Sequence, residues 1–199
     1  MEINYIYKYF PYISKLKYNK LKIDDVGLYS ISTPKNAEII SKIIKKYFFQ
    51  QNIIITDAMA GVGGNTLSFS SYFYYVNSIE IDENRFNHLV SNISLYDKSN
   101  ILCIKGDYLN LLYKIHQDVI FIDPPWGGKN YKDFEQISLM VGDKTLEDLC
   151  EDIRNNKLCK MIIIKLPLNY NTDNFSIKLK QNIHIETLPK MLIIVFIIK

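Results

Sequence analysis

One stretch of this sequence constrains the fold more than any other, because an apolar run in it stops at two consecutive prolines: Asp118-Val-Ile-Phe-Ile-Asp-Pro-Pro-Trp-Gly-Gly128. Residues 119–122 have the β-branched and aromatic content typical of a strand that is buried on both faces of a parallel sheet. Proline fixes φ and has no N–H to donate, so the chain has to leave the sheet at Asp123. The sequence therefore predicts a carboxylate and backbone carbonyls at the carboxyl end of a buried strand.

Asp123, Pro124 and Trp126 are the candidate catalytic residues, because this strand end offers hydrogen-bond acceptors without donors. Such acceptors suit a substrate that donates, for example an exocyclic amino group. Trp126 is the only tryptophan of the chain, and the Gly127-Gly128 pair lets backbone approach whatever the indole covers. We expect a flat nucleobase to bind here. The alternative is a strand-terminating turn with a core tryptophan, and the stretch alone does not decide between the two.

A second motif, Ile53-Ile-Ile-Thr-Asp-Ala-Met-Ala-Gly-Val-Gly-Gly-Asn-Thr66, predicts a cofactor site. An apolar strand ends at Asp57, a turn with Gly61 and Gly63 follows, and a helix begins after the turn, which brings backbone amides close to a ligand. Glu80 stands 23 residues after Asp57, close to the ~20 residues typical of an acid that binds ribose hydroxyls. Asp57 would repel a pyrophosphate but attract an ammonium, so we predict S-adenosylmethionine rather than a dinucleotide.

Two further acids follow predicted strands. Asp82 is expected to cap a helix that begins near Asn84. Asp107 can accept a hydrogen bond from the adenine amino group of the cofactor, or it can cap the segment Tyr108 to Ile115. Both alternatives for Asp107 stay open.

Strands and helices are expected to alternate from residue 34 onward. Thr33-Pro34 indicates the N-cap and first residue of a helix over residues 34–49. The other expected helices begin near residues 65, 84, 108 and 145, and the expected strands cover residues 53–57, 76–81, 101–105, 119–122, 161–166, 183–186 and 191–198. This order predicts an α/β fold with a seven-stranded, mostly parallel sheet, an antiparallel last strand and helices on both faces. Ligands would bind beyond the carboxyl ends of the parallel strands.

The composition favours an intracellular protein with one sizeable core. The chain has 199 residues, of which 48% are hydrophobic, but no stretch reaches the ~18 apolar residues of a membrane span. The N-terminus lacks the layout of a secretory signal, so we expect a protein of the cytoplasm or nucleus. We also expect a monomer that does not bind membranes. Cys103, Cys150 and Cys159 are too far apart to suggest a zinc site or a disulfide framework, and we expect no metal.

Residues 1–33 are expected to form an N-terminal extension on the substrate side of a catalytic domain that covers residues 34–199. Tyrosines and phenylalanines alternate with lysines between residues 5 and 20, a composition that can stack bases and bind phosphates. The alternative is an arm that packs on the domain and leaves its lysines in water. Residues 129–143 lack strong periodicity and are expected to form a mobile flap with Lys129, Tyr131 and Lys132.

These motifs resemble the catalytic domain of trimethylguanosine synthases, the S-adenosylmethionine-dependent RNA cap hypermethylases. The cofactor motif of that family resembles residues 57–66, and its signature resembles Pro124-Pro-Trp-Gly-Gly128. The similarity runs from about Tyr18 to the end of the chain. It implies a Rossmann-like class I methyltransferase fold and methylation of the 2-amino group of 7-methylguanosine in RNA caps, giving di- or trimethylguanosine.

The resemblance also implies residue roles. Trp126 would stack on the 7-methylguanine base, while Asp123 and Pro124 orient the amine. Because 7-methylguanine is cationic, an indole face adds a cation–π contribution of about 1 to 2 kcal/mol to the stacking. The motifs and the resemblance together predict which residues bind each ligand. The residues predicted to bind the cofactor are Thr33, Asp57, Gly61, Gly63, Asn65, Thr66, Glu80 and Asp107. The residues predicted to bind the substrate are Trp126, Tyr29, Lys129 and Asn169.

The chain departs from the family pattern at three positions. Asp123 stands where cellular members commonly have serine, and only Tyr29 remains of an aromatic pair. Leu168 stands where those members carry an arginine for the cap phosphates. Since the 24 basic residues include only two arginines, we expect Lys129, Lys132 or the lysines of residues 15–20 to contact phosphates. The abundance of isoleucine, asparagine and tyrosine suits a large DNA virus or an AT-rich unicellular genome.

Two other functions stay open. The same motifs could serve an amino-methyltransferase that acts on adenine or cytosine in RNA or DNA. A non-catalytic cap- or RNA-binding module could keep the fold without turnover, although the intact acids Asp57, Glu80 and Asp123 favour an enzyme. The sequence predicts neither the number of methyl groups added nor the RNAs that are methylated.

Overall fold

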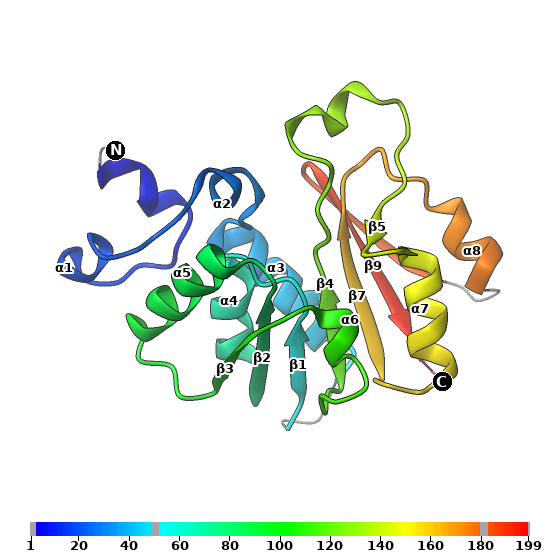
Figure 1. Ribbon diagram of the computed structural model, residues 1–199, viewed down its shortest axis with the longest axis horizontal. Coiled ribbons are helices and arrows are strands. Elements are labelled where there is room, and N and C mark those ends of the chain that lie inside the picture. Colours follow the sequence, from blue (N-terminus) through cyan, green and yellow to red (C-terminus); the bar gives the residue numbers. More distant parts are fainter. Residues whose placement is uncertain (1–2, 49–51, 180–182, 199) are drawn as a thin grey trace. The chain divides into compact units, whose positions relative to one another are not determined.

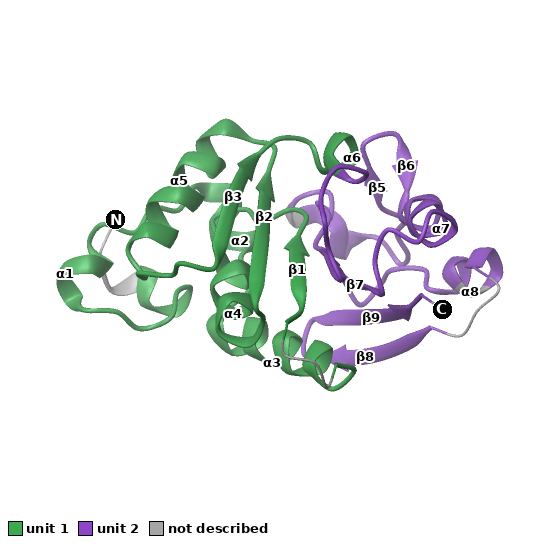
Figure 2. Ribbon diagram, turned by 90° about the horizontal axis from the view of Figure 1, so that it is seen from below, with its two compact units in different colours: residues 1–111 green, residues 112–199 purple. Residues whose placement is uncertain are grey.

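The computed structural model describes residues 3–48, 52–179 and 183–198 (Figure 1). The chain forms two compact units, residues 1–111 and residues 112–199 (Figure 2). The strand order of its seven-stranded sheet is β3-β2-β1-β4-β7-β9-β8. β9 is antiparallel to both of its neighbours, β7 and β8. The predicted α/β fold, with a mostly parallel sheet and an antiparallel last strand, is therefore confirmed.

The first unit contains three parallel strands with helices packed on them. Its elements are η1 (Ile3–Lys8), α1 (Lys15–Tyr18), α2 (Asp25–Ser30), α3 (Pro34–Lys45), β1 (Ile54–Asp57), α4 (Gly64–Tyr72), β2 (Tyr75–Glu80), α5 (Glu83–Ser94), β3 (Ile101–Lys105) and α6 (Tyr108–Leu111). β1 pairs with β2 and β2 with β3, both in parallel. α4 contacts β1 and β2, and α5 contacts β2 and β3 (Figure 1). Asp57 and Glu80 end β1 and β2, so both lie at carboxyl ends of parallel strands.

The second unit contains the stretch with the two prolines. Its elements are β4 (Val119–Ile122), η2 (Lys129–Asp133), β5 (Met140–Val141), β6 (Lys144–Thr145), α7 (Leu146–Asn155), β7 (Met161–Leu166), α8 (Asp173–Leu179), β8 (His184–Leu188) and β9 (Met191–Ile197). β4 pairs in parallel with β7, and every residue of both strands is buried. The chain leaves the sheet after Ile122, as the prolines predict.

Side-chain caps define several helix starts. Thr33 accepts a hydrogen bond from the Asn36 N–H ahead of Pro34, the first residue of α3. α3 ends at Lys45, earlier than predicted, and residue 49 lies outside the described residues. Asp82 accepts from the Arg85 N–H at the start of α5, so its predicted capping role is confirmed.

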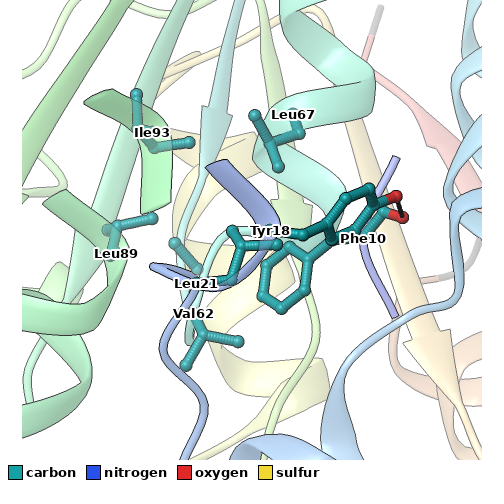
Figure 3. Packing of buried hydrophobic residues seen from close by; sticks show 8 residues of the cluster. Phe10, Tyr18, Leu21, Val62, Leu67, Leu89 and Ile93 are labelled. Atoms are coloured by element: carbon teal, nitrogen blue, oxygen red, sulfur yellow. Dashed lines mark hydrogen bonds between the residues drawn. The ribbon is translucent and has the colours of Figure 1, made fainter. Parts of the chain in front are cut away.

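The N-terminal arm packs on the first unit through a hydrophobic cluster. Phe10, Tyr18 and Leu21 of the arm are buried against residues of the glycine turn, α4 and α5: Val62, Leu67, Leu89 and Ile93 (Figure 3). The Tyr18 hydroxyl donates to a backbone carbonyl of the arm itself. The packed-arm alternative is confirmed for these residues, whereas Tyr12 remains 86% exposed. A role of residues 1–33 on the substrate side stays a prediction.

Local structure differs from the sequence-based expectation at three places. α1 and α2 were not predicted, because each is too short to show helical periodicity. The helix after β3 ends at Leu111 instead of residue 115. Residues 129–143 contain η2 and β5, and the backbone of Ile137 hydrogen-bonds to residues 169 and 171, so the expected flap is anchored at its centre.

All three cysteines are free, and burial raises the pKa of the Cys159 thiol to about 12. Over the described ranges, no helix has the length and apolar character needed to cross a membrane.

Candidate active site

Asp57 ends β1, and its carboxylate is held by a buried hydroxyl. Oδ2 accepts a hydrogen bond from the Thr66 Oγ1 at 2.6 Å, and Thr66 Oγ1 lies 2.7 Å from the Ser78 Oγ. Thr66 belongs to α4 and Ser78 to β2, so this link joins three elements of the first unit. Thr66 is fully buried and orients the Asp57 carboxylate, whereas its predicted contact with the cofactor stays a prediction.

Replacing Thr66 with valine is expected to lower the free energy of unfolding by about 1–3 kcal/mol, because the buried Asp57 and Ser78 oxygens each lose a hydrogen bond. Urea denaturation followed by circular dichroism measures this change. Ser94→Ala is the control, since it removes an exposed hydroxyl of α5 that bonds only to the Ser91 carbonyl; a change below about 0.5 kcal/mol is expected. Equal effects of the two substitutions would contradict the assigned link.

Glu80 ends β2, and its two carboxylate oxygens bind the glycine turn and the residue that caps α5. Oε2 accepts from the Gly61 N–H and Oε1 from the Asp82 N–H, each at 2.8 Å. The Arg85 guanidinium lies 3.6 Å from Glu80 Oε1 and at the same distance from the carboxylates of Asp24 and Asp82. Glu80 is therefore buried, oriented and charge-compensated. Because a carboxylate offers about four lone-pair directions, it can also accept a pair of ligand hydroxyls.

The glycine turn leaves open space beside its backbone. Gly61 and Gly63 have φ values of 56° and 101°, and a Cβ built on Gly61 would meet no atom within 4 Å. Gly64 approaches residue 32 so closely that its Cβ would lie 3.0 Å from the Ser32 carbonyl oxygen. Within the described part of the chain, the Ser32 hydroxyl and the Asn65 Oδ1 are buried without a hydrogen-bond partner. Such atoms carry a desolvation penalty that a polar ligand removes.

In the second unit, the Asp123 carboxylate pairs with a lysine that the sequence analysis did not identify. Lys165 lies in β7, and its Nζ is 2.6 Å from Asp123 Oδ2. Only 5% of the Lys165 side chain and 15% of the Asp123 side chain are exposed. Burial raises the pKa of the Asp123 carboxyl above its usual value, and the charge and hydrogen bond of Lys165 oppose that shift. The ion pair fixes the orientation of the carboxylate.

Trp126 is partly exposed, which does not fit the alternative of a core tryptophan. The Lys165 Nζ lies 5.2 Å from the centroid of its indole. The Tyr131 and Trp126 rings make a T-shaped contact, with centroids 5.2 Å apart and ring planes at 83°. The indole Nε1 is buried, and no described residue accepts its hydrogen bond. A flat indole, a buried cation and an oriented carboxylate therefore gather directly after β4, next to the buried Pro124.

Asn169 holds the segment that carries Tyr131. Its Nδ2 donates to the Tyr131 and Phe134 carbonyl oxygens, both at 2.8 Å. The two glycines after Trp126 have positive φ values and open space where a Cβ would be. Lys129 begins η2, and its side chain lies outside the described part of the structure. Asn169 thus holds the segment whose Tyr131 ring contacts the indole, while substrate contacts of Asn169 and Lys129 stay predictions.

The remaining predicted residues have structural roles or exposed positions. Asp107 Oδ1 accepts from the Leu109 N–H at 2.9 Å, so the capping alternative is confirmed and its cofactor contact stays a prediction. Thr33 caps α3, as described above. Tyr29 is 49% exposed on α2. Substrate contact by Tyr29 and cofactor contact by Thr33 stay predictions as well.

A family profile described as RNA cap guanine-N2 methyltransferase matches residues 52–193. The chain belongs to this family. It is 36% identical to a protein of Acanthamoeba polyphaga mimivirus over 94% of this chain and 82% of that protein. It is 34% identical to the trimethylguanosine synthase of Schizosaccharomyces pombe, over 55% of this chain and 47% of that protein. It is 27% identical to the trimethylguanosine synthase of Saccharomyces cerevisiae, over 78% of this chain and 53% of that protein. The chain spans about half the length of the two yeast synthases.

Solved methyltransferase structures share the fold. A methyltransferase of Porphyromonas gingivalis superposes with a TM-score of 0.63 at 19% identity, over 88% of this chain and 43% of that one. The precorrin-6y C5,15-methyltransferase of Geobacter metallireducens superposes with a TM-score of 0.61 at 11% identity, over 89% of this chain and 93% of that one. Such distant similarity shows the fold alone, and the predicted Rossmann-like class I methyltransferase fold is confirmed.

The family uses S-adenosylmethionine, so the predicted cofactor is confirmed. Groups at the carboxyl ends of β1 and β2 fit this molecule. The buried Glu80 carboxylate suits the vicinal ribose hydroxyls, and the unsatisfied Asn65 Oδ1 suits an ammonium. The open space beside Gly61 leaves room for a ligand against the backbone.

Lys165 and Arg85 were not among the residues predicted for the site. Lys165 is the only charged residue in β7, and a lysine inside an apolar strand is a signal of a buried partner. Arg85 is one of only two arginines and follows Glu80 and Asp82 closely in the sequence, a spacing that could have indicated an ion pair but not its geometry.

Proposed function

We propose that this chain transfers a methyl group from S-adenosylmethionine to the 2-amino nitrogen of 7-methylguanosine in RNA caps. The observation that carries the proposal is the stretch after β4, where a partly exposed indole stands three residues after an oriented carboxylate. An indole face binds a cationic purine by stacking and cation–π attraction. A carboxylate accepts hydrogen bonds from an exocyclic amine. Family membership supports the same substrate class.

Asp123 and Pro124 position the amine in this proposal. Lys165 binds Asp123 Oδ2, so Oδ1 is the oxygen that accepts one amine N–H. The Pro124 carbonyl oxygen accepts the second amine N–H. Prolines have no N–H, so the backbone here offers acceptors without donors. Held in this way, the amine keeps its nitrogen lone pair free for the incoming methyl group, and the rate enhancement comes mainly from orientation. Formation of the new N–C bond breaks the S–C bond to the methyl group and leaves a neutral thioether, and the amine nitrogen then releases one proton to solvent.

S-adenosylmethionine, when bound, supplies an electrophilic methyl group on a sulfonium. Glu80 accepts from the ribose hydroxyls, and its hydrogen bond to Gly61 keeps the glycine turn in place. Asn65 Oδ1 accepts from the ammonium of the methionyl group, and the Asp57 carboxylate adds electrostatic attraction.

Lys132 is the proposed contact for the cap phosphates. Leu168, at the position where the resemblance predicts an arginine, is 55% exposed and offers no charge. Lys132 lies on η2, with its Nζ 5.7 Å from the Tyr131 ring that packs on Trp126. A lysine attracts phosphate as a point charge, without the bidentate geometry of arginine. Lys129 on the same segment is the second candidate.

Methyl transfer to cap analogues tests the proposal. The protein is incubated with labelled S-adenosylmethionine and either 7-methylguanosine diphosphate or guanosine diphosphate. We expect transfer to the first nucleotide only, because the 7-methyl group makes the base cationic and strengthens its attraction to the indole. Product mass then distinguishes one from two added methyl groups.

Three other outcomes would contradict the proposal. Methylation of uncapped RNA or DNA oligonucleotides at adenine or cytosine would favour a different amino-methyltransferase. Binding of 7-methylguanosine diphosphate without turnover would favour a cap-binding module. Equal transfer to both guanine nucleotides would remove the role of the 7-methyl charge.

A further inference from the structure

Two aspartate–lysine pairs bracket the adjacent strands β4 and β7. Asp118 and Lys160 precede the strands, whereas Asp123 follows β4 and Lys165 lies near the end of β7. The Lys160 Nζ is 2.7 Å from Asp118 Oδ1, and the Lys165 Nζ is 2.6 Å from Asp123 Oδ2. The parallel register from Val119↔Met161 to Ile122↔Ile164 places each aspartate opposite its lysine. The same pair of residue types therefore occurs at both ends of one strand pair.

The two pairs differ in exposure. The Lys160 side chain is 58% exposed, so water screens its charge. The Lys165 side chain is 5% exposed, and its Nζ lies 5.2 Å from the Trp126 indole centroid. Burying an ammonium is costly unless an anion compensates it. Asp123 supplies that anion, so the pair adds no net charge beside the indole.

We propose that Lys165 is a positioning and specificity-determining residue of the base-binding stretch, with two tasks. Its ammonium covers one face of the Trp126 indole, so the base stacks on the other face. Its charge cancels that of Asp123, so the preference for a cationic base comes from the indole. This inference rests on the proposed function, because it concerns how 7-methylguanine is distinguished from guanine at that site.

Neutralising Asp123 alone exposes the charge of Lys165 to the base. Asp123→Ser keeps an oxygen that accepts from the amine but removes the anion that pairs with the Lys165 ammonium. Two cations on opposite faces of one indole repel each other, so binding of the cationic base weakens while binding of the neutral base does not. The preference for 7-methylguanosine diphosphate over guanosine diphosphate is expected to fall on the order of tenfold, from a pair of unit charges in a partly buried environment. Adding Lys165→Met removes the ammonium as well and restores the preference for the 7-methylated nucleotide.

Quenching of tryptophan fluorescence measures the preference, because Trp126 is the only tryptophan in the chain. The full chain is titrated with each of the two nucleotides, and the ratio of dissociation constants is compared among variants. Asp123→Ser should lower the ratio, and Asp123→Ser with Lys165→Met should return it to within about threefold of the original protein. Lys165→Arg keeps a cation and should keep the ratio. Asp123→Asn is also uncharged and is closer to aspartate in size, so it replaces the serine variant in this comparison if that variant does not fold.

Asp118→Ser, alone and with Lys160→Met, is the matched control at the other end of the same strands. These variants should leave the ratio unchanged. A low ratio that persists in the Asp123→Ser/Lys165→Met variant, or an unchanged ratio in Asp123→Ser, would overturn the role of Lys165. If the unsubstituted protein itself shows no preference for the 7-methylated nucleotide, the proposed function fails and this inference fails with it.

Discussion

Replacing Trp126 with alanine is expected to lower kcat/KM for methyl transfer to 7-methylguanosine diphosphate by about a hundredfold or more. Base stacking on an aromatic side chain contributes about 1–3 kcal/mol, and the cation–π attraction adds about 1–2 kcal/mol. The substitution also removes the surface on which the Tyr131 ring packs and the Lys165 ammonium lies, so the base-binding stretch loses its shape. Steady-state methyl transfer with labelled S-adenosylmethionine measures the effect.

Two variants separate stacking from general damage. Trp126→Phe keeps an aromatic face with a weaker quadrupole, so its kcat/KM should be about tenfold higher than that of the alanine variant. Tyr74→Ala removes an aromatic side chain that is 61% exposed between α4 and β2, and it should retain full activity. An alanine variant of Trp126 with undiminished kcat/KM would refute stacking on the indole.

The strands were predictable because they are short apolar runs with clear ends. The predicted and observed bounds agree for residues 119–122 and 161–166, where prolines or turns stop each strand. In both strands every residue is buried, so the sequence carries no polar alternation that would blur the pattern. The arm before α3 was less predictable, because its short helices depend on packing against Val62 and Leu89 rather than on local periodicity.

The site was predictable where function and backbone geometry coincide. The prolines place Asp123 at a strand end, and the glycine turn places Asp57 at another. Lys165 was missed because it is 42 residues from its partner in the sequence, and only the parallel pairing of β4 with β7 brings the two together. Contacts of this kind depend on strand order, which local sequence patterns do not encode.

Several residues that were predicted to bind a ligand have a structural task in the fold. Thr66 was predicted near the cofactor, and its hydroxyl holds the Asp57 carboxylate. Asn169 was predicted near the substrate, and its amide holds the segment with Tyr131. Glu80 anchors the glycine turn, and in the proposed function the same carboxylate accepts from the ribose hydroxyls. Its substitution should therefore affect cofactor binding more than the loss of one contact would.

Replacing Glu80 with glutamine is expected to weaken S-adenosylmethionine binding by about a hundredfold. Glutamine keeps the size of the side chain but carries one acceptor oxygen, so it cannot accept from the Gly61 and Asp82 N–H groups with separate oxygens and also bind two ribose hydroxyls. Hydrogen bonds to a charged acceptor contribute about 1.5–3 kcal/mol each, which corresponds to the expected loss. The substitution also leaves Arg85 with one fewer anionic neighbour.

Isothermal titration calorimetry measures the affinity for S-adenosylmethionine, and thermal unfolding with and without the cofactor gives an independent readout. At a cofactor concentration of about ten times the original dissociation constant, cofactor-induced stabilisation should nearly disappear in Glu80→Gln, because it grows with the logarithm of one plus the ratio of cofactor concentration to dissociation constant. Glu83→Gln is the matched control, since Glu83 begins α5, is 74% exposed and pairs with Lys105. If both glutamine variants bind the cofactor equally well, Glu80 does not bind the ribose, and the cofactor must be held by other residues of the first unit.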